Sequence, residues 1–357
     1  MALRAQAHID PAALAANAVT LRAVLSRGTR LCAVVKADGY GHGAALAAAH
    51  TGADWLAVAT ALEAAGLRAA GFATPRILVM GALSPAEREI ALAARADIVA
   101  WNLASLDGLP SVARVHVKLD SGMGRLGTRS PEQATAVAEA LAARGQLAGL
   151  MTHFATADVP GDPFFAEQLS RFTAWARPLN ARFPDALVHA ANSAATLAAP
   201  AAHFDMVRAG VALYGLDPAN TDPARLALRP ALRLTSYVAA VKACAAGESA
   251  GYGRRFVAAR DTVLATVPIG YGDGWRRGLT NNADVVIHGE RYPLVGTVSM
   301  DNITVDLGPG GSPVRPGDTV TLIGDGITAE EVAGRLGTLN YEVTCGLTAR
   351  VTRTEVA

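Results

Sequence analysis

A lysine stands where a short apolar run ends and a glycine-rich turn begins. Lys36 follows the apolar run 31–35, and glycines come at positions 39, 41 and 43. A short apolar run closed by turn residues is typical of a buried strand in a parallel sheet. At the carboxyl end of such a strand, burial disfavours the ammonium ion and leaves an amine that can form a Schiff base. The same stretch also fits a solvated lysine in a strand–helix loop.

Other polar side chains stand at the ends of later apolar runs. They are Lys118, Asp120, His153, Asn192, Ser193 and Arg208. If these runs are the parallel strands of one barrel, their carboxyl ends meet at one mouth, where catalytic residues of that architecture lie. Taken singly, each has a structural explanation, such as His153 bonding a backbone carbonyl or Arg208 pairing with an acid.

The last two strand ends offer an anion site. In such a barrel, the loops after strands seven and eight usually hold the phosphate site. Here they supply the hydroxyl of Ser193 and the backbone amides of Gly210 and Val211. A Schiff-base lysine beside a phosphate site predicts pyridoxal phosphate as the cofactor.

Eight apolar runs alternate with alanine-rich helical stretches. We predict helices with Pro85, Pro131 and Pro163 just inside their first turns, where proline starts helices well. Eight strand–helix units predict a (β/α)8 barrel. An open doubly wound sheet is the alternative, but no G-x-G-x-x-G with an acidic follower comes after a strand. The predicted strands are 31–35, 55–59, 76–80, 97–101, 115–119, 149–154, 188–192 and 206–208, and the helices are 60–70, 85–95, 131–144 and 163–183.

The pattern of the chain changes after residue 216. A polar, proline-bearing loop over 220–225 leads into short β-branched runs separated by Gly, Pro, Asn and Asp. These runs predict a mainly β domain after an α/β barrel. We expect the barrel, the cofactor-binding domain, over 9–227 and the mainly β domain over 228–357. The predicted strands of the second domain are 234–241, 262–267, 285–288, 302–305 and 319–323.

A tyrosine between two glycines, Gly251-Tyr252-Gly253, stands out in the second domain. One interpretation is a turn with a packed ring. The other is a phenol with a catalytic role. These residues alone do not decide between the two.

Composition and charge exclude several classes of protein. The 357 residues carry 32 Lys and Arg against 31 Asp and Glu, spread along the chain, so no nucleic-acid surface is expected. No membrane span is expected, and the N-terminus lacks the apolar core of a secretory signal. Cys32, Cys244 and Cys345 have no metal-ligand spacing and predict buried thiols in a reducing cytoplasm. No metal site is expected.

The motifs, taken together and in order, resemble those of the alanine racemase family over nearly the whole chain. The resemblance implies a cytoplasmic homodimer with shared active sites that interconverts L-alanine and D-alanine with pyridoxal 5'-phosphate, supplying D-alanine for cell-wall peptidoglycan. It also implies that residues 1–8 join the β domain. The motifs are A-V-V-K-A-D-G-Y-G-H-G (33–43), K-L-D-S-G-M-G-R-L-G (118–127), T-H-F-A-T-A-D (152–158), A-N-S (191–193), M-V-R-A-G-V-A-L-Y-G (206–215), G-Y-G (251–253), P-I-G-Y-G-D-G-W (268–275), G-T-V-S-M-D (296–301) and Y-E-V-T-C (341–345).

The resemblance implies four catalytic residues. Lys36 would hold the cofactor and handle the hydrogen on the D side, and Tyr252 would handle it on the L side. Because a free tyrosine has a pKa near 10, its work as a base near pH 7–8 needs about 3 kcal/mol of phenolate stabilisation, which His153 backed by Arg208 would supply. Arg208 would face the pyridine nitrogen, and as a donor it cannot accept the proton of that nitrogen, which disfavours transamination.

The resemblance also implies the residues that bind cofactor and substrate. Arg125 would contact the cofactor's phenolic oxygen and the substrate carboxylate, oriented by Lys118 if that lysine is carbamylated. The Met300 loop would present an amide to the same carboxylate, and Tyr271 would line the route to the site. The full cofactor set is Lys36, Tyr40, Arg125, Ser193, Arg208, Gly210 and Val211.

Three positions depart from the family pattern. Ala349 stands where the family often has a tyrosine that reaches the phosphate, Ser299 replaces a frequent cysteine, and Thr297 replaces a frequent arginine. A wider entrance leaves a broad-specificity amino-acid racemase, acting for example on serine, as the nearest alternative. A non-catalytic pyridoxal-phosphate-binding barrel and a metal hydrolase with a carbamylated Lys118 are the other two.

Overall fold

The computed structural model describes residues 4–310 and 313–356, which form two compact units. We call residues 14–40 and 44–213 the barrel unit, and residues 4–13, 41–43 and 214–356 the β unit. Among the described residues, no helix has the length and apolar character that crossing a membrane requires. No disulfide joins the cysteines in the described part of the chain. Cys32 and Cys244 are buried as expected, but the prediction for Cys345 is wrong, because it ends helix α10 and is exposed.

The barrel unit contains a parallel sheet whose strands run in the order β4-β3-β2-β9-β8-β7-β6-β5. The two outer strands meet through a parallel bridge between Leu78 and Asp97. Val79 N–H donates to Asp97 O (2.9 Å), and Asp97 N–H donates to Ile77 O (2.8 Å), so the sheet closes on itself. The predicted barrel is therefore confirmed. Its strands are β2 (Arg30–Val34), β3 (Trp55–Val58), β4 (Arg76–Val79), β5 (Ile98–Ala100), β6 (Val115–Lys118), β7 (Leu147–Met151), β8 (Leu187–His189) and β9 (Met206–Ala209).

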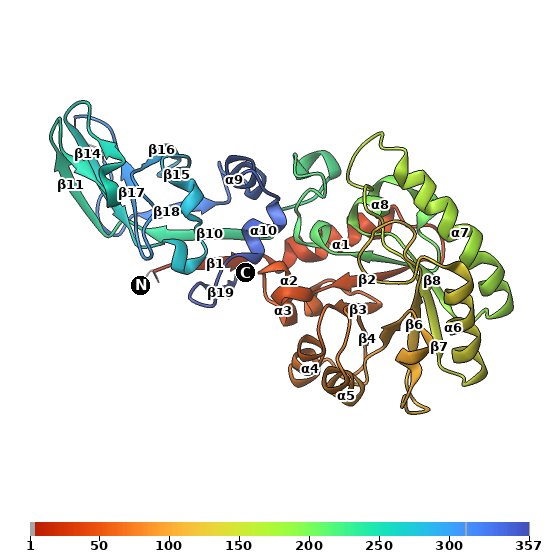
Figure 1. The fold of residues 1–357 in the computed structure, drawn as a ribbon. Coiled ribbons are helices and arrows are strands. Elements are labelled where there is room, and N and C mark those ends of the chain that lie inside the picture. Colours follow the sequence, from red (N-terminus) through yellow and green to blue (C-terminus); the bar gives the residue numbers. More distant parts are fainter. Residues whose placement is uncertain (1–3, 311–312, 357) are drawn as a thin grey trace. The chain divides into compact units, whose positions relative to one another are not determined.

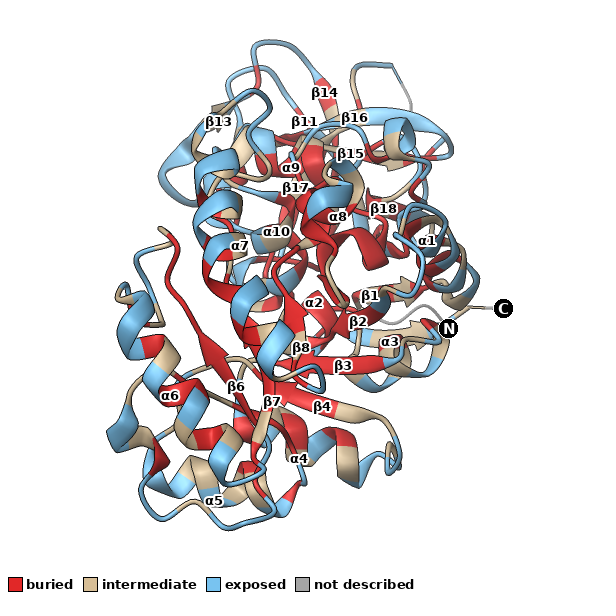
Figure 2. Ribbon diagram, turned by 90° about the vertical axis from the view of Figure 1, so that its right-hand side faces the viewer, coloured by how far each residue is buried: buried red, intermediate tan, exposed pale blue. Residues whose placement is uncertain are grey.

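Helices lie outside these strands (Figure 1), and Figure 2 shows the strands buried and the outer faces of α6 and α7 largely exposed. Pro85 and Pro131 are first helical residues after the N-caps Ser84 and Ser130, as predicted. Pro163 instead precedes α7, because Asp162 accepts the Phe164 N–H (2.8 Å) and fixes the start there. The helices are α1 (Pro11–Ala23), α2 (Lys36–Tyr40), α3 (Ala44–His50), α4 (Ala61–Ala69), α5 (Pro85–Ala93), α6 (Pro131–Ala143), α7 (Phe164–Arg182) and α8 (Ser193–Ala198), with 3-10 turns η1 (Leu103–Leu106), η2 (Pro200–Ala202), η3 (Val211–Tyr214) and η4 (Pro223–Leu226).

The β unit holds a mixed sheet in the order β11-β14-β17-β16-β15-β18-β10-β1-β19 and a small β12-β13 pair. The N-terminal strand β1 runs antiparallel to β10 and parallel to β19. The predicted strand 234–241 is two strands, since the ladder with β18 ends at Tyr237. The elements are β1 (Gln6–Ile9), β10 (Leu232–Tyr237), β11 (Ala240–Cys244), β12 (Ser249–Ala250), β13 (Phe256–Val257), β14 (Thr262–Val267), β15 (Asp284–Ile287), β16 (Glu290–Val295), β17 (Ile303–Asp306), β18 (Thr319–Ile323), β19 (Thr352–Glu355), α9 (Ala329–Leu336), α10 (Asn340–Cys345), η5 (Tyr252–Arg254), η6 (Tyr271–Asp273) and η7 (Arg277–Leu279).

Candidate active site

Lys36 stands one residue beyond the end of β2, the first barrel strand, and opens a strained turn. Ala37 and Asp38 have φ and ψ near +50° and are followed by Gly39 in the same region. Left-handed backbone costs an L-residue roughly 1–2 kcal/mol, and such strain is typical of functional sites. The carboxylate of Glu63 holds the turn by accepting the Ala37 N–H at 2.6 Å. The backbone next to Lys36 is therefore held in a conformation that is unfavourable by itself.

Tyr40 lies near this lysine, and its hydroxyl lies beside the loop that begins with Gly210. The Nζ of Lys36 lies 5.9 Å from the centre of the Tyr40 ring. A Cβ added to Gly210 would lie 2.3 Å from the Tyr40 hydroxyl, so only glycine permits this approach. The Ser193 hydroxyl accepts the N–H groups of Gly210 (2.9 Å) and Ala212 (3.3 Å). Both amides thus donate to the Ser193 hydroxyl, whose own proton can be donated onward, and the Tyr40 hydroxyl lies beside the same loop. This donor set fits a phosphate dianion.

Arg208, on β9, is buried and has several hydrogen-bond partners. Its Nη1 donates to Nδ1 of His189 (2.7 Å). Its Nη2 donates to the carbonyl oxygens of Thr152 (2.8 Å) and Ala190 (3.0 Å), and to Nδ1 of His153 (3.3 Å). Burial lowers the pKa of Arg208 to about 10, which leaves the group a cation at neutral pH. Since guanidinium only donates, both imidazoles accept with Nδ1.

The bonding of Arg208 continues through the barrel interior. With Nδ1 of His189 an acceptor, its Nε2 carries the proton and donates to Nδ1 of His116 (2.8 Å). His116 then donates from Nε2 to Asp97 (3.0 Å), which also pairs with Arg76. The interior of such a barrel is commonly filled by branched apolar side chains. Here a chain of hydrogen bonds, which we call the relay, joins the mouth to the opposite end of the barrel. Arg208 fixes the tautomer of His189, and His189 fixes that of His116.

His153 and Lys118 both have lowered pKa values at this mouth. Burial, and then the charges of Arg208 and Lys118, hold the pKa of His153 well below 6.5. His153 is therefore neutral, with its proton on Nε2 and available to donate. Burial, followed by the charges of Arg208 and Arg125, lowers the pKa of Lys118 to about 8. Lys36 adds to the effect on both groups, so four cationic side chains share one mouth and favour an anionic ligand.

Two strand-end residues singled out in the sequence instead shape the backbone. Asp120 accepts the N–H groups of Gly122 (3.1 Å) and Gly124 (3.0 Å), which folds the loop that carries Arg125. Asn192 does not end a strand, because its side chain accepts the Ala195 N–H (3.0 Å) and caps α8. The predicted strand 188–192 is correspondingly too long at its end.

In the β unit, the side chains of Tyr252, Met300 and Tyr271 are 75%, 51% and 42% exposed. Gly251 and Gly253 have positive φ on either side of Tyr252, and Thr297 Oγ1 donates to the Tyr252 carbonyl at 2.7 Å. The backbone at Tyr252 is thus held while its phenol projects outward. A ring packed against its own chain, the first interpretation of this motif, is excluded.

Comparison with known proteins gives the family. The model of the alanine racemase N-terminal domain matches residues 9–218, and that of the alanine racemase C-terminal domain matches residues 231–355. This chain belongs to the alanine racemase family. The family and the fold class expected from the motifs are both confirmed.

Individual alanine racemases are similar over nearly the full length. That of Symbiobacterium thermophilum is 43% identical, covering 97% of this chain and 96% of the relative. Alanine racemase 1 of Bacillus subtilis is 39% identical, covering 97% and 92%. The crystal structure of alanine racemase from E. faecalis superposes with a TM-score of 0.92 at 36% identity, covering 99% and 98%. The biosynthetic alanine racemase from Pseudomonas aeruginosa gives a TM-score of 0.89 at 36% identity, covering 99% of each chain.

The relay of His189, His116 and Asp97 in this family member was not found from the sequence. His116 and His189 do carry a signal, because each is a histidine inside an apolar run predicted to be a buried strand. A buried imidazole needs a hydrogen-bond partner, and two such strands of one barrel can supply it to each other. The partners become clear only once the barrel closes.

Proposed function

We propose that this chain is an alanine racemase that interconverts L-alanine and D-alanine with pyridoxal 5'-phosphate. One observation carries the proposal: in a chain of this family, Lys36 lies near the ring of Tyr40, whose hydroxyl lies beside Gly210, and the Gly210 amide bonds the Ser193 hydroxyl. That combination suits a phosphorylated aldehyde, whose phosphate and carbonyl need donors and an amine, respectively.

Each of these residues has a role in holding the cofactor. Lys36 would bind it covalently, while the hydroxyls of Tyr40 and Ser193 and the amide of Val211 would bind the phosphate. Gly210 would contribute through its amide, which donates to the Ser193 oxygen and leaves that hydroxyl's proton for the phosphate. When bound, the cofactor supplies an electron sink that acidifies the α-hydrogen of the amino acid. Arg208 would face the ring nitrogen as a cation that cannot take up a further proton. It thereby limits the sink and favours proton transfer over transamination.

Racemisation needs a base on each face of the α-carbon, because the hydrogen leaves one face and returns to the other. We assign the D-side hydrogen to the amine of Lys36 and the L-side hydrogen to the phenol of Tyr252 of the partner subunit. The active form is then a homodimer with shared sites. The neutral His153, with its proton on Nε2, is suited to donate a hydrogen bond to the phenolate oxygen of that tyrosine and so stabilise the anion.

Arg125, Met300 and Tyr271 complete the site as substrate-binding residues. Arg125 would bind the substrate carboxylate, and Met300 and Tyr271 of the partner subunit would line the approach to it. Lys118, whose pKa is lowered to about 8, has enough neutral amine at pH 7–8 to add carbon dioxide. The resulting carbamate, formed with loss of one proton, would orient Arg125. We further assign cofactor binding to residues 9–227 and the second base to residues 228–357 with 1–8.

One assay tests the function. The purified protein, loaded with pyridoxal 5'-phosphate, is incubated with L-alanine, D-alanine or L-serine, and the enantiomers are separated by chiral chromatography. We expect alanine to racemise in both directions, faster than serine. Equal rates on many amino acids would instead identify a broad-specificity racemase. Borohydride reduction should leave the cofactor on the peptide of Lys36, and its absence from that peptide would contradict the assignment. Growth of a D-alanine auxotroph tests the role in peptidoglycan supply.

A further inference from the structure

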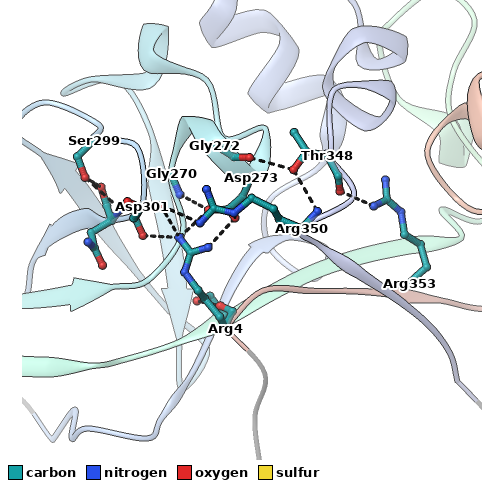
Figure 3. Close-up of polar contacts among 11 residues, drawn as sticks. Arg4, Gly270, Gly272, Asp273, Ser299, Asp301, Thr348, Arg350 and Arg353 are labelled. Carbon is teal, nitrogen blue, oxygen red and sulfur yellow. Dashed lines mark hydrogen bonds and ion pairs between the residues drawn. The ribbon is translucent and has the colours of Figure 1, made fainter.

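A buried carboxylate lies under the turn that carries Tyr271. Asp273 ends η6 and is fully buried. Arg4 donates to it from both terminal nitrogens, Nη1 to Oδ1 at 2.7 Å and Nη2 to Oδ2 at 2.9 Å (Figure 3). Arg350 Nε lies 3.2 Å from Oδ1. The Gly270 N–H also donates to Oδ2 at 2.9 Å. Asp273 thus pairs with two arginines and the start of its own turn.

The same two arginines reach the loop that carries Met300. Arg4 Nη2 donates to the carbonyl oxygen of Asp301 at 2.7 Å. Arg350 Nη2 donates to the carboxylate of Asp301 at 2.7 Å. The guanidinium groups therefore join the turn of Asp273 to the neighbour of Met300, as Figure 3 shows. We call Arg4, Asp273, Asp301 and Arg350 the clamp.

Backbone bonds hold the two loops in register at the clamp. Tyr271 N–H donates to Ser299 O at 3.0 Å, and Gly272 N–H donates to Met300 O at 2.9 Å. A Cβ at Gly272 would lie 2.3 Å from Arg350 Nη1, so the Arg350 guanidinium packs closely over this backbone. The side chains of Tyr271 and Met300 remain substantially exposed. The backbone of both loops is fixed, and two side chains are presented to the outside.

We propose that Asp273, paired with Arg4 and Arg350, is a positioning residue that fixes Tyr271 and Met300 relative to each other as one preformed substrate-facing surface. The inference deepens the proposed function and rests on it for the identity of the substrate. Preformed loops avoid the cost of ordering when substrate binds. Loss of the clamp therefore raises KM for alanine more than it lowers kcat, because the proposed bases Lys36 and Tyr252 are outside the clamp.

A second ion cluster in the β unit supplies a matched control. Asp284 lies 3.6 Å from Arg291 Nη1 and pairs closely with Arg335. It is likewise one carboxylate shared by two arginines, but it contacts neither the Tyr271 turn nor the Met300 loop in any of these bonds. Asp284→Asn therefore reports what the loss of such a charge does to the unit in general.

The test compares wild type, Asp273→Asn and Asp284→Asn as full-length, cofactor-loaded proteins. Hydrogen exchange by mass spectrometry follows peptides over 269–275 and 297–303, and steady-state kinetics give KM and kcat for L-alanine. For Asp273→Asn we expect exchange in both peptides to speed up about tenfold or more. KM should rise about tenfold, while kcat changes less than about threefold. Asp284→Asn should change neither the exchange of these peptides nor KM.

The exchange measurement keeps the clamp and the proposed function separable. If the wild-type protein does not racemise alanine, the proposed function is wrong. If hydrogen exchange in both peptides of Asp273→Asn is the same as in wild type, the proposed positioning role of Asp273 is wrong. A fall in kcat with KM unchanged would also overturn it. Should Asp273→Asn not fold, Arg350→Ala replaces it, since that side chain is 44% exposed and Arg4 still pairs with Asp273. We then expect a raised KM that added guanidinium lowers, and no rescue would count against the clamp.

Discussion

Arg208 Nη1 donates a 2.7 Å hydrogen bond to Nδ1 of His189. This contact ties the cation proposed for the cofactor's ring nitrogen to a buried relay that ends at Asp97 and Arg76. A guanidinium with fixed acceptors cannot rotate away without leaving buried polar atoms unpaired. The relay in the barrel interior therefore fixes the orientation of the Arg208 guanidinium.

The relay gives a prediction for His189. Glutamine can accept from Arg208 with its oxygen and donate to His116 with its nitrogen, whereas leucine can do neither. We expect His189→Leu to lose about 1–3 kcal/mol of unfolding free energy and most activity, because it strands two buried polar groups. His189→Gln should retain more of both. Urea denaturation and turnover measurements check this, and equal losses in the two variants would contradict the relay.

The lowered pKa values of His116, His153 and His189 predict acid sensitivity. Below pH 6.5 the unfolded chain binds protons that these buried imidazoles do not, so stability is full above that pH and falls as pH drops toward their folded pKa values. Each contributes a slope of about 1.4 kcal/mol per pH unit in that window. The unfolding free energy, measured at fixed protein concentration, should depend less steeply on pH in His153→Gln than in wild type. The difference should correspond to about one proton. An unchanged slope would show that His153 titrates normally.

Lys118, with its pKa lowered to about 8, is predicted to be carbamylated. The neutral fraction of the Lys118 amine grows as pH rises from 7 to 9. The gain in activity on adding bicarbonate should therefore increase over that range. Carbon-13 NMR with labelled bicarbonate should show a carbamate signal that Lys118→Gln lacks. A signal of equal strength in that variant would place the carbamate elsewhere.

Gly210 supplies a prediction about cofactor affinity. In Gly210→Ala the new methyl meets the Tyr40 hydroxyl at 2.3 Å, so one phosphate donor must move. We expect the apoprotein to bind pyridoxal 5'-phosphate at least about tenfold more weakly, as loss of one charge-assisted hydrogen bond implies. Gly66→Ala is the control, because it lies in α4 with nothing within 4 Å and should leave affinity unchanged. Equal affinity of both variants, followed by absorbance titration, would contradict the assigned phosphate site.

The barrel could be predicted because its signals are local. Eight apolar runs separated by helical stretches, with Ser84 and Ser130 before prolines, indicate the elements without reference to distant residues. Lys36 and Ser193 were predicted as site residues for the same reason, since each follows an apolar run. Asn192 was placed at a strand end because the buried residues Ala190 and Ala191 continue the apolar run beyond the end of β8.

The rest depended on pairings that sequence spacing does not reveal. Arg4 and Asp273 are 269 residues apart, and neither lies in a motif with an obvious partner. The bond between His116 and His189 likewise joins β6 and β8, which β7 separates in the sheet, so these two side chains meet only inside the barrel. Which residues form such ion pairs and buried relays depends on the topology. They can therefore be identified only after the fold is known.

The central claim is that Lys36 of one subunit works with Tyr252 of the other. Lys36→Ala and Tyr252→Phe are each expected to be almost inactive alone. Co-expressed with separate affinity tags, they form heterodimers in which one of two sites keeps both bases. In an equal, random mixture half the dimers are heterodimers, so we predict about a quarter of wild-type racemisation. A mixture no more active than the separate variants, or near-normal turnover by Tyr252→Phe alone, would contradict the account.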